Sequence, residues 1–460
     1  MSDITHKTRV DAHGNTRAGF CEIISIQIEN YAGDIRDLKV VAHTIRITES
    51  LMVPGLTLEI AIQDAINFFE EFELRGQEKI RIHLRQQFNK RDAKLARKTD
   101  IELEFFVTDF SEFVRGTDNQ KQAYKIVGVT EQMFLSSLKK ISRPLRANTA
   151  DEIRNIFVDD LRLPPEKFVI HGDTSTKYKG VLNWDTPLSH AMNLRDKLLD
   201  GNNTPYFLYQ TISGNVYLSP LSYLIDGETN PTYSKYLDRS FSEATEGLPE
   251  KEYETMIKMK SVSSQLGMSH LENAMSGAYA GRYNYIDIFH KSHAIENFNS
   301  LSTQTKDKYR ITQVGNINED FKVSVDKTST QLSLNEIPLA SLNYSYRNAH
   351  GFEDDIARVG LNSGDINEKT RKLHRSYIKS YDSVVQSVEL VGDFLLSPGS
   401  KIELDFSKAI AMDQYKRVHD KSETQEKDLA LSGQYLVFGC VHEITGGEYS
   451  ISVRAKKDNI

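Results

Sequence analysis

Two stretches near opposite ends of the chain share one pattern, and this repetition constrains the fold more than any other feature. The first is VPGLTLEIAI at 53–62 and the second is SPGSKIELDF at 397–406. Each has a Pro-Gly pair and then a segment in which apolar and polar side chains alternate. Such alternation predicts half-buried antiparallel strands. Pro followed by Gly suits the central positions of a type II turn, because Pro fixes φ and Gly permits a positive φ.

The two stretches align when Pro54 and Gly55 are placed on Pro398 and Gly399. The alignment then matches Leu58 with Ile402, Glu59 with Glu403, Ile60 with Leu404 and Ile62 with Phe406. A later pair of strands supports it, since YKIVGV at 124–129 resembles YLVFGC at 435–440. The sequence therefore predicts one small β-barrel unit present twice, with the two Pro-Gly pairs as its structural turns. Convergence of unrelated β-strands is the alternative.

The predicted fold class is a β-rich, multidomain α+β protein in which two similar small antiparallel β-barrels, N- and C-terminal, flank an α+β domain and a β-rich inserted region. Residues 1–147 would form the first barrel and 148–225 the α+β domain. Residues 226–364 would form the inserted region, and 365–460 a helix plus the second barrel. At roughly 150 residues per domain, the length of 460 residues allows this division.

Local signals place the helices and one hairpin of this division. Thr149 and Glu152 have capping-box spacing at the start of a helix, whose apolar stripe is Ile153, Ile156, Phe157 and Leu161. Thr186 and Pro187 suit the start of a second helix and Gly201 suits its end. Ser213-Gly214-Asn215 is typical of a hairpin turn. Asp365 and Glu368 predict the start of a helix that includes Leu373, Tyr377 and Tyr381.

The composition argues against several classes of protein. The net charge of −7 argues against broad binding of nucleic acid through phosphates. No apolar run approaches the roughly 20 residues needed to span a bilayer, and the polar start has no signal-peptide core. Because Cys21 and Cys440 are the only cysteines, we expect two buried, reduced thiols. We therefore expect assembly in a cytoplasm and no membrane insertion.

The sequence offers few candidates for chemistry. The motifs HExxH, GxSxG, GxxxxGK[ST] and GxGxxG are absent. His290 and His293 are interpreted as surface imidazoles, because zinc needs three or four ligands, and 319–330 lacks a calcium-loop pattern. We predict no catalytic residue, no metal site and no cofactor, although two distant carboxylates of a hydrolase would leave no local motif.

We expect structural rather than functional roles for a few other side chains. The pairs Asp159-Asp160 and Asp354-Asp355 are placed on a helix and in a loop, and His442-Glu443 in a strand. Trp184, the only tryptophan, is expected in the core rather than as a platform for a sugar. The basic stretch KRDAKLARK at 90–98 is interpreted as a solvated loop, with a partner or inter-subunit contact as the alternative.

The C-terminal segment carries a longer pattern. A Tyr-bearing helix is followed by GDFLLSPGSKIELDFSKA at 392–409 and by GQYLVFGCVHEITGGEYSISVRA at 433–455. This order resembles the last domain of the baseplate hub protein of contractile-tailed bacteriophages of the T-even kind. The matching positions are Gly392, Phe394, Leu396, Pro398, Gly399, Ile402, Tyr435, Val437 and His442. Residues 129–157 are similar to the segment that leaves the first barrel in that family.

The resemblance implies a structural virion protein rather than an enzyme. Hub proteins of this family, and the related hub part of type VI secretion spike proteins, are homotrimers whose two barrels per chain form a pseudo-sixfold ring. The ring would join the tail tube protein to a threefold central spike protein and line the channel for ejected DNA, with other baseplate (wedge) proteins around it. The spike tip and any lysozyme would be separate chains. A tail-associated cell-wall hydrolase and a receptor- or glycan-binding tail module are the alternatives.

Overall fold

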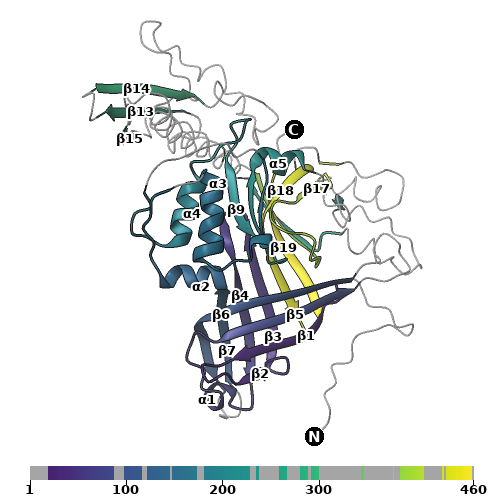
Figure 1. Cartoon of the computed structure of the whole chain (residues 1–460). Helices are drawn as coiled ribbons and strands as arrows, with labels where there is room; N and C mark the ends of the chain where they lie inside the picture. The colour runs from purple at the N-terminus through teal and green to yellow at the C-terminus, as the bar shows by residue number, and fades with distance from the viewer. Residues whose placement is uncertain are drawn as a thin grey trace, which may run out of the picture.

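The structure is a computed structural model. It describes residues 19–87, 98–116, 122–145, 148–172, 181–227, 235–237, 258–266, 280–287, 292–299, 343–346, 377, 384–408, 427–428 and 431–457. Strands from both ends of the chain form one large, mainly antiparallel sheet (Figure 1). The β-rich, α+β character that the sequence predicts is therefore confirmed, but the strands join one large sheet, and the described residues form no closed barrel.

The main path of this sheet runs β12-β16-β19-β18-β3-β4-β7-β6-β5-β1-β2. Its N-terminal strands are β1 (Glu22–Glu29), β2 (Ile35–Asp37), β3 (Ala42–Ser50), β4 (Val53–Asp64), β5 (Lys79–Gln87), β6 (Lys98–Arg115) and β7 (Gln122–Thr130). Its C-terminal strands are β16 (Val384–Val391), β17 (Lys401–Asp405), β18 (Gly433–Thr445) and β19 (Glu448–Lys457). The short strands β11 (Lys235–Leu237) and β12 (Ser261–Leu266) pair with β17 and β16.

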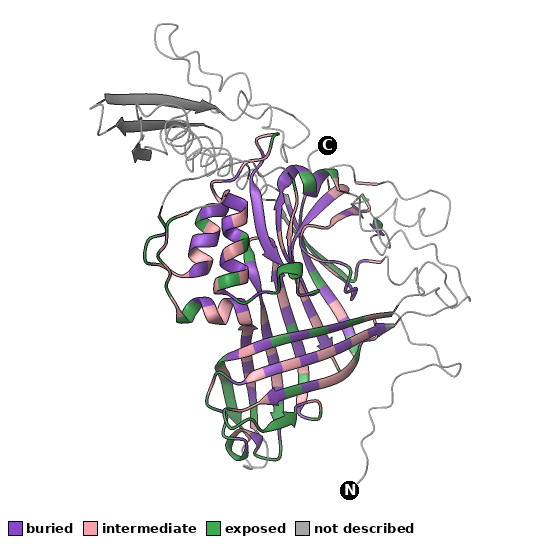
Figure 2. Ribbon diagram, viewed as in Figure 1, coloured by how far each residue is buried: buried purple, intermediate pink, exposed green. Residues whose placement is uncertain are grey.

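The alternating side chains of the N-terminal strands form one apolar core. In β5, Ile80, Ile82 and Leu84 are buried, whereas the residues between them are partly exposed. Figure 2 shows this alternation of buried and accessible positions along the strands. The short helix α1 (Phe68–Glu71) adds Phe68 to the core. Burying an isoleucine or leucine side chain stabilises a fold by about 1.5–3 kcal/mol before chain entropy is counted, so this alternation fixes which face of each strand points inward.

The C-terminal strands enclose a second core. The order is β17-β18-β19-β16-β12, with β11 on the free edge of β17. An isolated parallel bridge joins Leu237, at the end of β11, to Lys258, shortly before β12. Apolar side chains from these strands, among them Tyr236, Leu390 and Ile402, pack into this core. These strands thus form the C-terminal part of the large sheet, with β11 as the outer neighbour of β17.

A smaller unit lies against the large sheet. Strands β8 (Phe168–Ile170), β10 (Val216–Pro220) and β9 (Tyr206–Gln210) form a three-stranded sheet. The helices are α2 (Glu131–Leu138), α3 (Thr149–Asn155), a π-helical turn (Ile156–Asp160), a 3-10 turn (Pro165–Lys167), α4 (Pro187–Arg195) and α5 (Leu221–Asp226). Figure 1 shows α3 and α4 on one side of β9 and α5 on the other. The predicted hairpin is confirmed, with Gly214 at φ +81° in its turn.

The predicted helix signals are only partly correct. The stripe Ile153, Ile156, Phe157 and Leu161 is fully buried, as predicted. The cap of α3 is Asn148 rather than Thr149, because the Asn148 side chain accepts the backbone N–H of Asp151. Thr186 caps α4 and Pro187 begins it, as predicted. The helix nevertheless ends at Arg195 rather than at Gly201.

Parts of the remaining predictions fall outside the described residues. Strands β13 (Ala280–Asp287), β14 (Ser292–Asn299) and β15 (Asn343–Tyr346) form a separate three-stranded sheet within the predicted inserted region. Of the helix predicted from Asp365, only Tyr377 is described, and it is helical and buried. His290, Asp354-Asp355 and 319–330 lie outside the described residues. In the described parts of the chain, no helix is long and apolar enough to cross a membrane.

Candidate functional site

The two Pro-Gly pairs of the repeat have different backbone structures. Pro398 and Gly399 occupy the centre of a turn in which Ser400 donates its N–H to the Ser397 carbonyl at 3.1 Å. Gly399 has φ +88°, which the type II turn requires of its third residue. Pro54 and Gly55, however, lie inside strand β4, and Gly55 does not adopt a positive φ. The predicted turn at Pro54-Gly55 is therefore wrong.

Both glycines of the repeat are nonetheless places of close approach. A Cβ on Gly55 would lie 2.2 Å from the Met133 sulfur of α2. A Cβ on Gly399 would lie 2.8 Å from the Tyr209 hydroxyl of β9. Each glycine thus lets the smaller α/β unit pack on the large sheet.

Strand β4, which contains the first Pro-Gly pair, and strand β17, which follows the second, have the same kind of neighbour. Strand β4 pairs antiparallel with β7, and Leu58 faces Gly128. Strand β17 likewise pairs antiparallel with β18, but Ile402 faces Tyr435. Relative to the sequence alignment, the second pairing is shifted four residues along β18, an even number that keeps the same side chains on the same face.

The connections around these strand pairs differ. The strand before β4 is β3, which forms a hairpin with it. The strand before β17 is β16, which pairs with β12 and β19 instead. The repeat therefore consists of a shared pair of strands with different connections.

The two halves meet at a seam between β3 and β18. These strands pair antiparallel from Ser50 opposite Gly439 to Thr44 opposite Thr445. β18 is continuous across the seam, because its first residues pair with β17 and its later residues with β3 on the same side. The seam thus makes one hydrogen-bonded sheet from the two ends of the chain.

A buried polar cluster lies on the seam. His442 of β18 has its Nε2 at 2.5 Å from Oε1 of Glu49 in β3 and its Nδ1 at 2.7 Å from the hydroxyl of Tyr449 in β19. His442 and Glu49 are at most 1% exposed. A neutral imidazole with its hydrogen on Nε2 satisfies both bonds, because it donates to the carboxylate and accepts from the tyrosine. This cluster ties three strands together.

Burial sets the protonation of the groups around this cluster. It raises the pKa of the Tyr449 hydroxyl well above its usual value, so the group keeps its proton and can donate to His442. Burial likewise raises the pKa of the Cys440 thiol, with a further contribution from the Glu49 carboxylate, and it raises the pKa of Cys21 to about 12. Both cysteines are free and buried, as predicted.

A second buried contact joins the halves beside this cluster. Gln86 of β5 donates its side-chain N–H to the Gly392 carbonyl at 2.7 Å and accepts the Phe394 N–H at 3.2 Å. The amide thus pairs with the backbone as a strand would. Residues near the start of the chain add a third contact, because Cys21 donates its N–H to the Gly447 carbonyl at 3.0 Å.

The outward face of the N-terminal strands carries columns of opposite charge. Arg81 of β5 lies 2.9 Å from Glu104 of β6 and 3.3 Å from Glu29 of β1. The basic column on β5 is Lys79, Arg81, His83 and Arg85, and the acidic columns are Asp100, Glu102 and Glu104 on β6 and Glu22 and Glu29 on β1. Neighbouring columns therefore compensate each other's charge. Of the basic stretch 90–98, only Lys98 is described.

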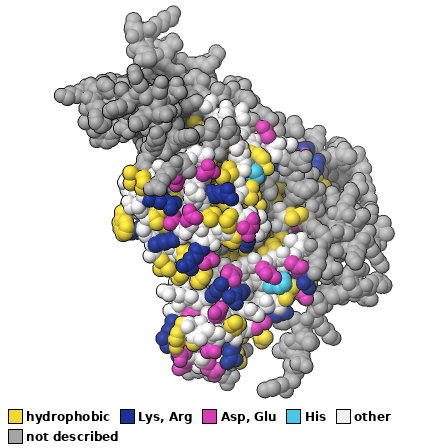
Figure 3. Space-filling model, viewed as in Figure 1, with side chains coloured by type: hydrophobic (Ala, Val, Ile, Leu, Met, Phe, Trp, Pro, Cys, Tyr) yellow, Lys and Arg dark blue, Asp and Glu magenta, His cyan; other side chains and the backbone are white. Residues whose placement is uncertain are grey.

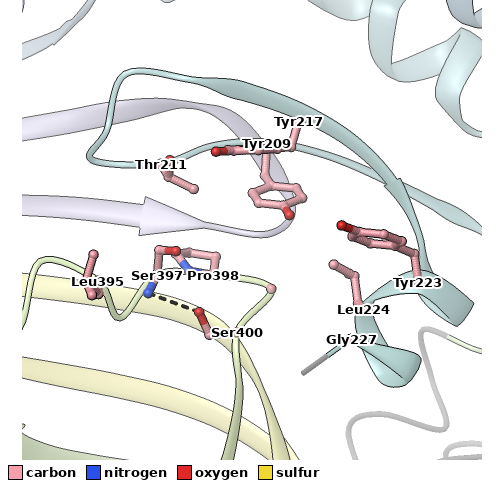
Figure 4. A pocket seen from close by; sticks show the side chains of 11 residues that line it. Tyr209, Thr211, Tyr217, Tyr223, Leu224, Gly227, Leu395, Ser397, Pro398 and Ser400 are labelled. Carbon is pink, nitrogen blue, oxygen red and sulfur yellow. Dashed lines mark hydrogen bonds between the residues drawn. The ribbon is translucent and has the colours of Figure 1, made fainter. Parts of the chain in front are cut away.

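A pocket of about 280 Å³ opens between the α/β unit and the Pro398-Gly399 turn (Figure 4). Its lining residues are Tyr209, Thr211, Tyr217, Tyr223, Leu224, Gly227, Leu395, Ser397, Pro398, Gly399 and Ser400. The rings of Tyr209 and Tyr217 stack with centroids 5.4 Å apart, and Tyr223 stacks on His171 at 4.0 Å. Among the described residues, the side chains that line this pocket are uncharged, and they combine tyrosine rings with the hydroxyl groups of Thr211, Ser397 and Ser400.

Trp184 is exposed, so its prediction as a core residue is wrong. It is 72% exposed, and Leu138 and Val181 of the same unit are 63% and 62% exposed. Figure 3 shows hydrophobic side chains along the edge of the molecule that carries α2 and α4. The tryptophan precedes the helix cap, and the apolar stripe that packs inward belongs to α3 and α4.

The described residues contain no group of three or more His, Cys, Asp or Glu side chains that could hold a metal ion. Asp160 forms an ion pair with Arg143 at 3.2 Å. Glu443 is partly exposed and pairs with Arg46 at 2.8 Å. The candidate site is therefore the buried seam, which the sequence indicated only through the His442 position of the family pattern. Glu49 and Gln86 gave no local signal.

No protein-family model matches the sequence, and a comparison with curated proteins finds no match. Among solved structures, the chain is similar to the 43 kDa tail protein of prophage MuSo2 from Shewanella oneidensis (TM-score 0.47, 10% identity, 94% of this chain and 98% of that chain). It is also similar to a tail protein from Neisseria meningitidis (0.46, 8%, 94% and 96%). A third similar structure is a component of the type VI secretion system from E. coli, which is described as structurally similar to bacteriophage T4 tail proteins (TM-score 0.43, 8% identity, 95% of this chain and 77% of that chain).

Proposed function

We propose that the chain is a structural virion protein of a contractile-tailed bacteriophage, the homotrimeric hub of the tail baseplate. The observation that carries this proposal is the β3–β18 seam, which holds two similar strand pairs in one continuous sheet. A subunit built in this way presents two related surfaces in a fixed relation. Three such subunits in a closed ring present six, which suits a threefold assembly that must meet a sixfold one.

The strand order supports two barrel-like units as the docking elements. In the N-terminal unit, proposed as residues 1–147, the strands from β1 to β7 share a core that includes Ile80, Ile82 and Leu84. In the C-terminal unit, proposed as residues 365–460, strands β16 to β19 line the second core and pair with β11 and β12, which come from residues 226–364. Residues 148–225 would form the α+β domain between them, and 226–364 the inserted region. The shared β4–β7 and β17–β18 pairs would give both units a similar tube-facing edge.

We propose three kinds of partner for this architecture. The ring would contact the tail tube protein on one side and a threefold central spike protein on the other, with wedge proteins of the baseplate around it. Its channel would pass DNA without holding it. The compensated charge columns on β1, β5 and β6 are consistent with this, because phosphates bind to surfaces with excess Lys and Arg. We propose that the protein is not an enzyme and needs no cofactor, and that it assembles in the host cytoplasm.

The test is the mass of the native chain, alone and mixed with a tube protein and with a spike protein. We expect a species of three chains that binds both partners. A chain that stays monomeric and binds neither would refute the proposal. Release of fragments from peptidoglycan by the purified chain, lost on substitution of one carboxylate, would instead support a cell-wall hydrolase.

A further inference from the structure

Strand β11 takes a place in the C-terminal half that a longer strand takes in the N-terminal half. In the repeat, β17 corresponds to β4 and β18 to β7. Strand β4 lies between β7 and β3, and β17 lies between β18 and β11. However, β3 has nine residues and pairs antiparallel, whereas β11 has three and pairs parallel. Parallel pairing is slightly less stable per residue, so the backbone holds β11 less firmly than β3.

The side chains of β11 contact both faces of the sheet at the edge of β17. Tyr236 pairs with Leu404, and both side chains are buried in the second core. Lys235 pairs with Glu403 on the other face, where its Nζ lies 2.6 Å from Oδ2 of Asp405 and 3.6 Å from Oε1 of Glu403. A strand added to a sheet edge gains affinity from its backbone and specificity from its alternating side chains. The edge of β17 thus selects an extended segment in which a lysine precedes an aromatic residue.

Asp405 keeps a partner when Lys235 leaves. Asp405 is 5% exposed, and its second carboxylate oxygen forms an ion pair with Lys427. Lys427 forms an isolated bridge with Ser407, just after β17, and also lies 3.6 Å from Glu403. A buried carboxylate is most costly when it has lost its partner, and here Lys427 would remain. The Lys235 side chain is itself 48% exposed. The ion pair therefore fixes the position of β11 and adds little to the free energy of opening it.

Further contacts hold the end of β11. The Leu237 carbonyl accepts the Met259 N–H at 3.0 Å, and Leu237 forms an isolated parallel bridge with Lys258. Tyr236 is the one buried residue of the three in β11. By contrast, β18 has 13 residues and β19 has ten, with buried side chains along both. Parts of a fold with few buried apolar contacts open locally, below the free energy of global unfolding. We therefore expect β11 to open before β18 and β19.

We propose that β11 is a releasable strap that opens while the rest of the large sheet stays folded, and that the edge of β17 then binds an extended segment of another protein in which a lysine is followed by an aromatic residue. The lysine would bind Asp405 and Glu403, and the ring would take the place of Tyr236. While the strap is closed, β11 occupies this edge itself and protects it from pairing with unrelated strands. The site lies within a single chain, so it is independent of the proposed ring.

Native-state hydrogen exchange on the full chain tests the release. The amides of Lys235 to Leu237 should be protected at least tenfold less than those of β19. Lys235→Gln should accelerate exchange in β11 several-fold and leave β19 unchanged, because Asp405 keeps Lys427. Asp405→Asn removes both ion pairs and should accelerate exchange in β11 further. Glu112→Gln, which removes the surface pair with Lys125 at 2.7 Å, is the matched control and should change neither rate.

A disulfide across the strap tests the docking site. Lys235 and Glu403 are partners in neighbouring strands, whose spacing of about 4.8 Å is one that a disulfide can span. The chain with Lys235→Cys and Glu403→Cys is closed when oxidised and can open when reduced, and its two natural cysteines stay buried. A labelled peptide of residues 233–239, YSKYLDR, should bind the reduced chain at least tenfold more tightly than the oxidised one. The same peptide with Lys235→Glu should bind neither form.

Three outcomes would overturn the proposal. Protection of β11 equal to that of β19 would refute the release of the strap. Equal binding of the peptide to the oxidised and reduced chains, or binding to neither, would refute the docking site. Equal binding of the two peptides would refute recognition of the lysine by Asp405. None of these outcomes bears on the mass of the native chain, which tests the hub.

Discussion

Glu49 and His442 are separated by 393 positions in the sequence, yet their side chains are joined at 2.5 Å inside the seam. Neither side chain reaches solvent. The contact links β3 of one half to β18 of the other and extends to Tyr449 of β19. Loss of one member should therefore disturb both halves together.

The first prediction concerns this pair. His442→Leu should lower the free energy of unfolding by about 3–5 kcal/mol, because it leaves the Glu49 carboxylate buried without its partner. The double variant Glu49→Leu with His442→Leu should recover part of the loss. Denaturant unfolding provides the measurement. Glu443→Gln is the control, since its partly exposed pair with Arg46 should be worth less than about 1 kcal/mol. Equal losses in the control and in His442→Leu would refute the assignment.

The second prediction concerns pH. Burial raises the pKa of Cys21 from 9.0 to about 12. A raised pKa in the folded state gives stability that is complete below the unfolded pKa and is lost as pH rises, here between about pH 9 and 12. At pH 10 the loss from this thiol should be about 1.4 kcal/mol. Under reducing conditions, Cys21→Ala should show a smaller drop in unfolding free energy between pH 8 and 10 than the parent chain. Parallel pH profiles would contradict this.

The third prediction concerns Gly392. A Cβ at this position would lie 2.2 Å from the ring of Tyr449, and that ring is bound to His442. Gly392→Ala should therefore destabilise the fold by about 3 kcal/mol, at the upper end of overpacking costs. Gly201→Ala is the matched control, because nothing lies within 4 Å of its added Cβ. Thermal unfolding of both variants measures this difference in stability. A Gly392→Ala chain as stable as the control would contradict the close packing of Gly392 against Tyr449.

The fourth prediction concerns Gln86. Gln86→Leu leaves the buried Gly392 carbonyl and Phe394 N–H without the partners they have at 2.7 and 3.2 Å. Each such group costs about 1–3 kcal/mol, so the variant should be less stable by at least that amount. Hydrogen exchange at the Phe394 amide should rise as well. Gln63→Leu, at an exposed position of β4, should leave both quantities unchanged.

The sequence predicted the strands well, because alternation reports which face of a strand is buried. Ile80, Ile82 and Leu84 illustrate this. The Pro-Gly pairs predicted turns less reliably. Pro398-Gly399 forms the expected turn, but Gly55 lies in a strand, where a larger residue would collide with Met133. No pattern in the neighbouring sequence indicates that contact. The prediction that Trp184 is buried was wrong, because the sequence does not show which side of the short segment before α4 faces the helices. The roles of Glu49 and Gln86 could not be predicted from the sequence, because their partners lie hundreds of residues away along the chain.

The pairing of both ends of the chain in one seam has a consequence for biosynthesis. While the ribosome is still producing the middle of the chain, strand β3 has no neighbour on its seam edge, since β18 is the second-last strand to be made. An open strand edge of this kind invites pairing with other chains, and contacts between distant parts of a sequence form slowly. Nascent chains should therefore be most prone to aggregate just before release, and truncation before residue 433 should leave them permanently so.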